Sequence, residues 1–255
     1  MSKVAILDYQ ISNRGLAGDV NLAWELIRSG ISGHYMACAN PHSLVVASGD
    51  RIFERALKNA DILVPDGIGI VLAAKILNLS LSERVAGYDF FIALTKLAQK
   101  NGGLKYFFLG SNENVLELIV KRFENEFPSI EVCGTYSPPF KDEFSEEENA
   151  QMVDAINLAR PDVLWVGMTA PKQEKWIYQN RDRLDVSFMG AIGAVFDFYA
   201  GTKKRSSFFW QRLGLEWMPR LLKEPRRMWE RTFVSAPKFI GLVLWEYLLR
   251  YSKPK

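Results

Sequence analysis

Short apolar runs alternate with helical stretches along the first part of the chain, and this alternation constrains the fold most strongly. Buried strands are predicted at 35–39, 62–64, 106–109, 131–134, 162–167 and 186–190. The stretches between them are long enough for helices, among them 70–77, 90–99, 115–127, 146–159 and 173–180. This spacing predicts an α/β fold with a mainly parallel, Rossmann-like sheet and helices on both faces.

The composition changes near Gly201. Residues 203–255 contain thirteen Lys or Arg and four Glu, a net charge of +9, whereas residues 1–202 carry a net charge of −6. Four of the seven tryptophans also lie in this last part. We therefore expect an α/β core at 1–202 and a basic, aromatic, helical appendage at 203–255 that contacts an anionic partner.

The appendage mixes basic residues with bulky apolar ones, which favours an anionic membrane surface over nucleic acid. Residues 239–249 suit a helix lying in the membrane interface, and a docked amphipathic helix or a contact in a homo-oligomer are the alternatives. No stretch approaches the roughly 20 apolar residues needed to span a bilayer. The two cysteines and the lack of a signal-peptide pattern predict a reduced, cytoplasmic setting.

Asp66 is the first candidate for chemistry. The apolar run 62–64 ends at Pro65, and Asp66-Gly67 then turns the chain. A carboxylate is thus left at the carboxyl end of a predicted strand, where open α/β sheets bind their ligands. An ordinary Asp-Gly turn without chemistry is the alternative.

Other polar loops follow other predicted strands, at 40–42, 84–89, 110–112 and 169–174. In a parallel sheet they would gather with Asp66 on one edge. Gly110 opens a helix start that could offer backbone N–H groups to a phosphate, or could be an ordinary turn. Lys172 and Gln173 lie in the first turn of a predicted helix and are expected to face a ligand, with a solvated first turn as the alternative.

Metal sites and nucleophilic triads have little support in the sequence. There are two histidines, His34 and His42, and no Asp-x-Asp or Gly-x-Ser-x-Gly pattern. We therefore expect no metal and no further cofactor. If a sugar nucleotide is the substrate, basic side chains and backbone amides must meet the charge of its leaving group.

Six motifs occur together in a characteristic order. The chain carries Asn40-Pro41-His42, Pro65 to Gly69, Glu83 to Asp89, Phe108-Leu109-Gly110, Pro171 to Glu174, and Gly214 to Trp217 followed by Arg220 and Pro225-Arg226. With these motifs the sequence, from about Tyr35 to Phe233, resembles the WecG/TagA/CpsF glycosyltransferases, glycosyltransferase family 26.

The resemblance implies a metal-independent, inverting transfer from a nucleotide sugar to a polyprenyl-diphosphate-linked saccharide. The donor is expected to be a UDP-linked hexose or N-acetylhexosamine, used in bacterial cell-surface polysaccharide synthesis. The enzyme would be peripheral on the cytoplasmic face of the cell membrane. The family's base then falls on Asp66, its donor contacts on Asn40, Arg84 and Gln173, and its acceptor-diphosphate contacts on Arg220, Arg227 and the neighbouring Arg231.

One position departs from the family pattern, because Cys38 stands where the family often has Thr. A hydroxyl that could orient the sugar or acceptor is missing there, so the resemblance implies the reaction class but not the sugar. Two other readings are open. A non-catalytic membrane-surface protein would use the basic tail alone, and a nucleotide-dependent oxidoreductase lacks its expected GxGxxG motif.

Overall fold

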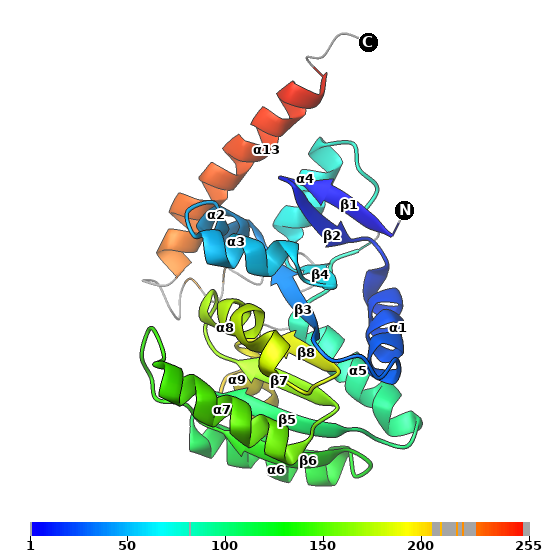
Figure 1. The fold of residues 1–255 in the computed structure, drawn as a ribbon. Helices are drawn as coiled ribbons and strands as arrows, with labels where there is room; N and C mark the ends of the chain where they lie inside the picture. The colour runs from blue at the N-terminus through cyan, green and yellow to red at the C-terminus, as the bar shows by residue number, and fades with distance from the viewer. Residues whose placement is uncertain are drawn as a thin grey trace.

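A six-stranded parallel sheet forms the centre of the protein (Figure 1). The computed structural model describes residues 2–81, 83–205, 210, 218, 221 and 228–251. The strands lie in the order β4-β3-β8-β7-β5-β6, and all neighbours pair in parallel. They are β3 (His34–Ala39), β4 (Ile62–Pro65), β5 (Lys105–Gly110), β6 (Glu131–Tyr136), β7 (Val163–Gly167) and β8 (Phe188–Ala191).

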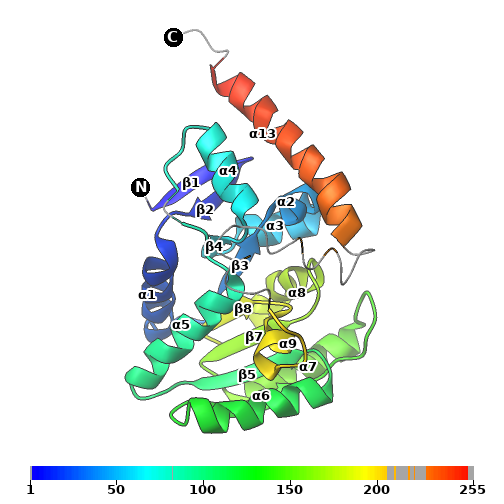
Figure 2. The ribbon, with the colours of Figure 1, turned by 180° about the vertical axis from the view of Figure 1, so that it is seen from behind.

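Helices cover both faces of this sheet, as the sequence predicted. On one face, four helices bury their apolar side chains in a single cluster: α1 (Gly15–Arg28), α5 (Gly87–Lys100), α6 (Glu113–Glu126) and α9 (Val195–Ala200). A second cluster lies under helices of the other face: α2 (Pro41–Ala47), α3 (Arg51–Lys58), α7 (Glu146–Ala159) and α8 (Lys172–Asn180). Figures 1 and 2 show these two layers from opposite sides.

The central strands are buried from both sides, which explains their sequence pattern. β8 is buried along its whole length, and β7 is buried except at Gly167. Strands that helices cover on both faces need continuous apolar runs rather than alternation. Their short length and the polar loops after them therefore identify these strands better than periodicity does.

The N-terminus forms a hairpin, although the apolar residues at 4–8 by themselves predict a single short strand. β1 (Lys3–Ile6) and β2 (Tyr9–Ser12) pair antiparallel, outside the main sheet. Leu7 and Asp8 turn the chain with φ of 49° and 63°. A two-residue turn of this hand fits hairpin strands, but leucine is an uncommon residue for it, so the turn gave no signal in the sequence.

The C-terminal helix packs on the core. It follows the π-helix η2 (Glu230–Ser235) as α13 (Ala236–Tyr251) and lies against α2 and α4 (Ile68–Ile76). Phe239 and Val243 are 3% and 1% exposed and belong to the second apolar cluster. The Glu246 carboxylate accepts a hydrogen bond from the Leu7 amide at 2.9 Å. The appendage thus contributes a core helix, and the division at residue 202 stays a prediction.

The stretch Glu230–Arg250 corrects one expectation. By length and composition it is long and apolar enough to cross a membrane, and 17% of its most apolar window is buried in the protein. The sequence predicts no such stretch, because its run of bulky apolar residues at 239–249 is only about half as long as a membrane span. The buried contacts of Phe239 and Val243 show a helix that packs along one side and leaves the other uncovered.

Replacing Phe239 by alanine tests this packing. The change leaves a cavity in the apolar cluster, so we expect the free energy of unfolding to fall by about 3 to 5 kcal/mol. Ile240→Ala is the matched control, since Ile240 is 52% exposed on the same helix and should cost less than about 0.5 kcal/mol. Equal losses in urea unfolding would contradict the docked helix.

Candidate active site

The polar loops after the strands share the carboxyl edge of the sheet, as the sequence predicted. Asn40 follows β3, Asp66 follows β4, Gly110 ends β5, and Gln173 lies in the first turn of α8, the helix after β7. Because all six strands are parallel, these residues lie along one edge. Asn40 and Asp66 follow neighbouring strands, and the Asp66 amide donates to the Ala39 carbonyl at 2.8 Å.

The Asp66 loop is fixed by its glycines. Gly67, the residue before α4, has a φ of 105°. This backbone conformation is strained for any residue with a side chain and is open to glycine. Gly69, in the first turn, packs so closely on Pro41 that a Cβ there would lie 2.4 Å from the proline ring. The loop after β4, which carries the half-buried Asp66, is therefore held against the start of α2.

The Arg84 segment joins the same edge. The Val85 amide donates a hydrogen bond to the Pro65 carbonyl at 3.0 Å. This bond holds the backbone next to Arg84 against the end of β4. Arg84 is half-buried beside it. The motif around Asp66 and the motif around Arg84, about 18 residues apart in the sequence, are thus joined through Pro65, the residue before Asp66.

Asn40 has a structural role that limits what it can offer a ligand. It caps α2, and its side-chain oxygen accepts from the Ser43 amide at 2.9 Å. The Asn40 amide in turn donates to the Ser43 hydroxyl at 2.8 Å, which completes a capping box. Among the described residues the Asn40 side-chain nitrogen has no hydrogen-bond acceptor, so it is the group of Asn40 that would donate a hydrogen bond to a ligand.

Gln173 and Glu174 form a buried polar pair at the start of α8. They are 4% and 2% exposed, and Gln173 Nε2 donates to Glu174 Oε1 at 2.9 Å. Within the described part of the chain, Gln173 Oε1 and Glu174 Oε2 have no hydrogen-bond partner. Unpaired polar atoms are costly in a protein interior, which makes this pair a candidate for contact with a substrate.

Glu174 is a further candidate residue at this edge, and the sequence alone does not predict it. Burial raises its pKa to about 7, although Gln173 and the charge of Arg231 act in the opposite direction. In the sequence it resembles any acidic residue in a first helical turn, where such residues are common. Only the packing around α8 distinguishes a buried carboxyl from a solvated one.

Cys38 lies close enough to Asp66 and Glu174 for both charges to act on its thiol. Burial raises the pKa of its thiol, and the charges of both carboxylates raise it further. Its sulfur lies 3.9 Å from the Ala191 carbonyl of β8, and Gly87 packs beside it. A thiol with a raised pKa is a poor nucleophile, so a structural role fits Cys38 better than a nucleophilic one.

Two residues predicted to contact a ligand, Lys172 and Gly110, lie at positions where neighbouring groups of the protein already form hydrogen bonds. The Lys172 ammonium donates to the Lys141 carbonyl and lies 4.8 Å from the ring centre of Phe144. At Gly110, the following amide of Ser111 donates to the Gly167 carbonyl at 3.1 Å. That amide is therefore already bonded, and fewer N–H groups face outward there than the sequence suggested.

The C-terminal segment reaches the same edge through η2. His42 Nδ1 and Ser235 Oγ are joined by a hydrogen bond of 2.8 Å, next to the capped start of α2. Arg231, in the same π-helix, is close enough for its charge to act on Glu174. Arg220 and Arg227 lie outside the described residues, so their expected contacts stay predictions.

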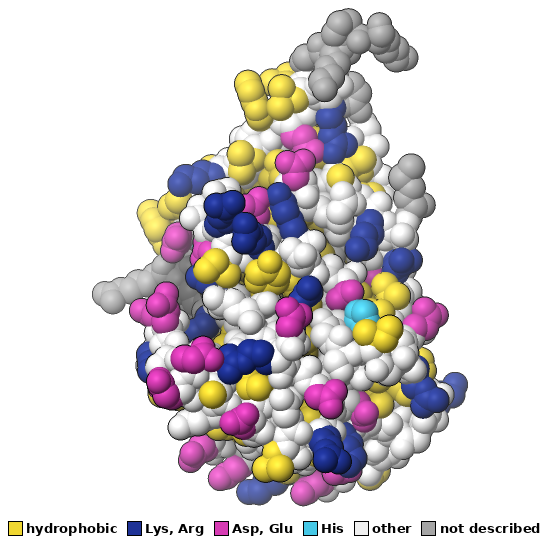
Figure 3. Space-filling view, in the orientation of Figure 1, with side chains coloured by type: hydrophobic (Ala, Val, Ile, Leu, Met, Phe, Trp, Pro, Cys, Tyr) yellow, Lys and Arg dark blue, Asp and Glu magenta, His cyan; other side chains and the backbone are white. Residues whose placement is uncertain are grey.

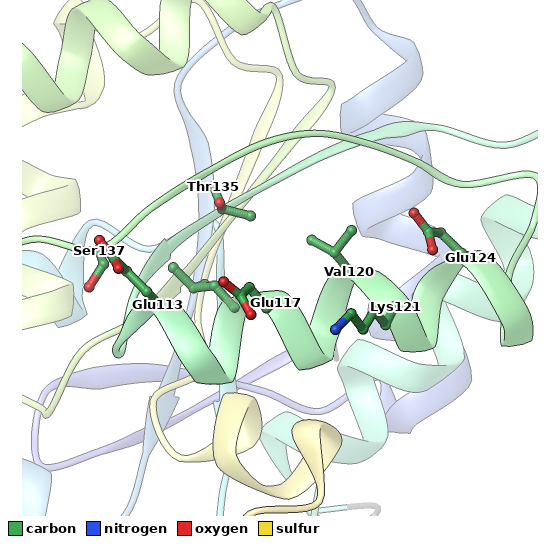
Figure 4. A pocket seen from close by; sticks show the side chains of 8 residues that line it. Glu113, Glu117, Val120, Lys121, Glu124, Thr135 and Ser137 are labelled. Carbon is green, nitrogen blue, oxygen red and sulfur yellow. The ribbon is translucent and has the colours of Figure 1, made fainter.

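No metal site marks this edge in the described ranges. No group of three His, Cys, Asp or Glu side chains there is arranged to hold a metal ion. One groove, of about 630 Å³, lies between α6 and β6 and is lined by residues such as Glu117 and Thr135 (Figure 4). At about 4.8 Å per strand, β6 is roughly 24 Å from β4 and its Asp66 loop.

These features define a doubly wound α/β protein whose polar loops meet at the carboxyl edge of the sheet, with a C-terminal helix docked beside them. The model of the glycosyl transferase WecG/TagA/CpsF family matches residues 4–253. The chain belongs to this family, which confirms the resemblance seen in the motifs. The match also takes in the N-terminal hairpin and α13, beyond the motif-bearing range.

Curated relatives include three proteins named N-acetylglucosaminyldiphosphoundecaprenol N-acetyl-β-D-mannosaminyltransferase. That of Bacillus spizizenii strain W23 is 33% identical over 83% of this chain and 79% of its own. That of Bacillus subtilis strain 168 is 31% identical over 88% and 85% of the two chains. That of Staphylococcus aureus strain MW2 is 27% identical over 89% and 87%.

The raised pKa of Glu174 predicts a pH dependence of stability. The folded protein binds the carboxyl proton of Glu174 more tightly than the unfolded chain does. The resulting stabilisation is complete below about pH 4.5 and is lost as the pH rises through about 7. We expect the free energy of unfolding to fall by roughly 2 to 3 kcal/mol from about pH 5 to about pH 8 through this group.

Glu174→Gln should remove this fall in the free energy of unfolding between about pH 5 and about pH 8. Urea unfolding at several pH values measures it. Asp19→Asn is the matched control, because burial raises the pKa of Asp19 to about 6, and Asp19 lies in α1 and accepts from the Ser12 hydroxyl rather than from Gln173. The control should keep the loss of stability around pH 7. An unchanged profile in Glu174→Gln would contradict a buried, titrating Glu174.

Proposed function

We propose that the protein transfers a sugar from a nucleotide sugar to a polyprenyl-diphosphate-linked saccharide in the synthesis of a bacterial cell-surface polysaccharide. The observation that carries the proposal is the position of Asp66, fixed between the ends of β3 and β4 beside Asn40 and Arg84. Family membership supports the reaction class, and the names of the relatives support the lipid-diphosphate acceptor.

The donor is proposed to be a UDP-linked N-acetylhexosamine or hexose. The relatives are named for an N-acetyl-β-D-mannosaminyl group, and a single displacement on an α-linked sugar nucleotide gives a β product. Cys38 differs from the threonine common in the family, and its thiol is a weaker hydrogen-bond donor. The identity of the sugar is therefore the part of the proposal that a donor screen must supply.

The chemistry is one in-line displacement. The acceptor hydroxyl oxygen attacks the anomeric carbon, the bond from that carbon to the diphosphate breaks, and the hydroxyl proton passes to Asp66. Arg84 balances charge on the leaving diphosphate, and Asn40 donates a hydrogen bond from its side-chain nitrogen. Gln173 contacts the sugar, with Glu174 holding its amide in place. This arrangement uses no metal ion.

The acceptor is proposed to reach this edge from the membrane. The protein would lie on the cytoplasmic face, with Arg220, Arg227 and Arg231 binding the acceptor diphosphate by charge-assisted hydrogen bonds. The closeness of Arg231 to Glu174 supports this placement of the C-terminal segment. Lys172 would have to leave the Lys141 carbonyl to take part.

Replacing Asp66 by asparagine tests the assignment. The amide keeps the shape of the side chain but cannot take the proton, so we expect turnover to fall by about 10²-fold or more. Transfer is measured with a screen of UDP sugars and an N-acetylglucosaminyl lipid diphosphate of short chain. Asp154→Asn, on the exposed side of α7, is the control and should keep normal turnover.

Near-normal turnover in Asp66→Asn would remove the base from the mechanism. Transfer from none of the UDP sugars, together with binding of NAD, would instead favour an oxidoreductase.

A further inference from the structure

The helix that follows the Asp66 loop carries an exposed apolar row. In α4, Ile68, Leu72 and Ile76 are 38%, 49% and 38% exposed. Their spacing of four residues places them on one side of the helix. The opposite side, with Ile70 and Ala73, is buried in the second apolar cluster. A helix that is apolar all round is normally covered on all sides, and the outer side of α4 has no cover in the described residues.

A second apolar row lies on the neighbouring helix. In α13, Ile240, Leu244 and Leu248 are 52%, 47% and 54% exposed, again four residues apart, and Trp245 beside them is 62% exposed. Apolar side chains are visible along the upper left margin in Figure 3, where Figure 1 places α13.

The two rows belong to one surface. α4 and α13 contact each other, and both bury their inner sides in the same apolar cluster. Their outer sides therefore adjoin at the end of the molecule where Figure 2 shows both helices. Soluble monomers rarely expose apolar surface of this extent without a partner.

The charges on this surface favour an anionic partner. α4 has no acidic residue, and its one charged side chain, Lys75, is exposed. On α13, Lys238 is exposed, whereas the carboxylate of Glu246 is turned toward the Leu7 amide and Arg250. Apolar rows flanked by lysines match the headgroup region of an anionic bilayer.

We propose that α4 is a second membrane-contacting element, which lies beside α13 in the headgroup region of an anionic bilayer. This inference rests on the proposed function, because a lipid-linked acceptor requires the active site to meet the membrane. Asp66 lies two residues before Ile68, so seating α4 in the interface brings the Asp66 loop to the depth of the acceptor diphosphate. The loop and its membrane contact are one continuous segment.

A second copy of the chain is a poorer occupant. A twofold contact places the same surface on both sides, and lysines such as Lys75 and Lys238 would then meet like charges in an apolar interface. Anionic lipids instead bring the opposite charge and fluid apolar chains.

The test is binding of the full-length protein to vesicles of equal parts phosphatidylglycerol and phosphatidylethanolamine. Leu72→Ser combined with Ile76→Ser should lower the vesicle affinity by about tenfold or more. Leu72→Trp should raise the affinity, because tryptophan favours the interface, and this opposite sign separates a surface effect from misfolding. Ile31→Ser with Leu158→Ser is the matched control, since both residues are exposed and apolar but lie on other parts of the molecule.

Two activity measurements separate this inference from the proposed function. Transfer to a short-chain, water-soluble acceptor should be unchanged in Leu72→Ser/Ile76→Ser, whereas transfer to a long-chain acceptor in vesicles should fall about as far as vesicle binding. Absence of transfer in the wild type would overturn the proposed function, and vesicle binding would still decide the role of α4.

Vesicle affinity equal to that of the wild type would overturn the inference about α4. A change in oligomeric state without a change in vesicle affinity would also overturn it, in favour of a contact between copies of this chain.

Discussion

The hydrogen bond from the Asp66 amide to the Ala39 carbonyl is the interaction on which the candidate site depends. It continues the pairing of β4 with β3 by one residue, so the carboxylate leaves the sheet at a fixed place. The contact of Gly69 with Pro41 then locks the start of α4 against the start of α2. These two contacts hold a potential base on rigid elements, which is what a positioned proton acceptor needs.

Electrostatics link this fixed edge to the C-terminal segment. Glu174 is buried with an unpaired oxygen, and burial opposes its ionisation. The nearby charge of Arg231 favours ionisation, so docking of the segment and the charge of Glu174 are coupled. The hydrogen bond between His42 and Ser235 fastens the same segment to α2. The described part of the C-terminal segment is thus held next to the core by a hydrogen bond and by charge.

Local signals predicted most of the fold. The helix at 146–159 was predicted with its observed bounds, because Ser145 and Glu148 form a capping box that depends on neighbours in sequence. The hairpin was not predicted, since Leu7 adopts a left-handed turn without glycine or asparagine. Within the site, the strand ends located Asp66 and Asn40. The roles of Glu174 and of the Asn40 cap depend on burial and hydrogen-bond partners, which the sequence does not contain.

The position of the sugar donor tests the central claim most directly, and a structure of the complex with a nucleotide sugar would measure it. With an acceptor oxygen between them, the anomeric carbon should lie about 5 to 6 Å from the Asp66 carboxylate, on the face opposite the diphosphate. Arg84 and Gln173 should contact the donor. A donor bound in the groove between α6 and β6, or one whose diphosphate faces Asp66, would contradict the assignment of this edge as the active site.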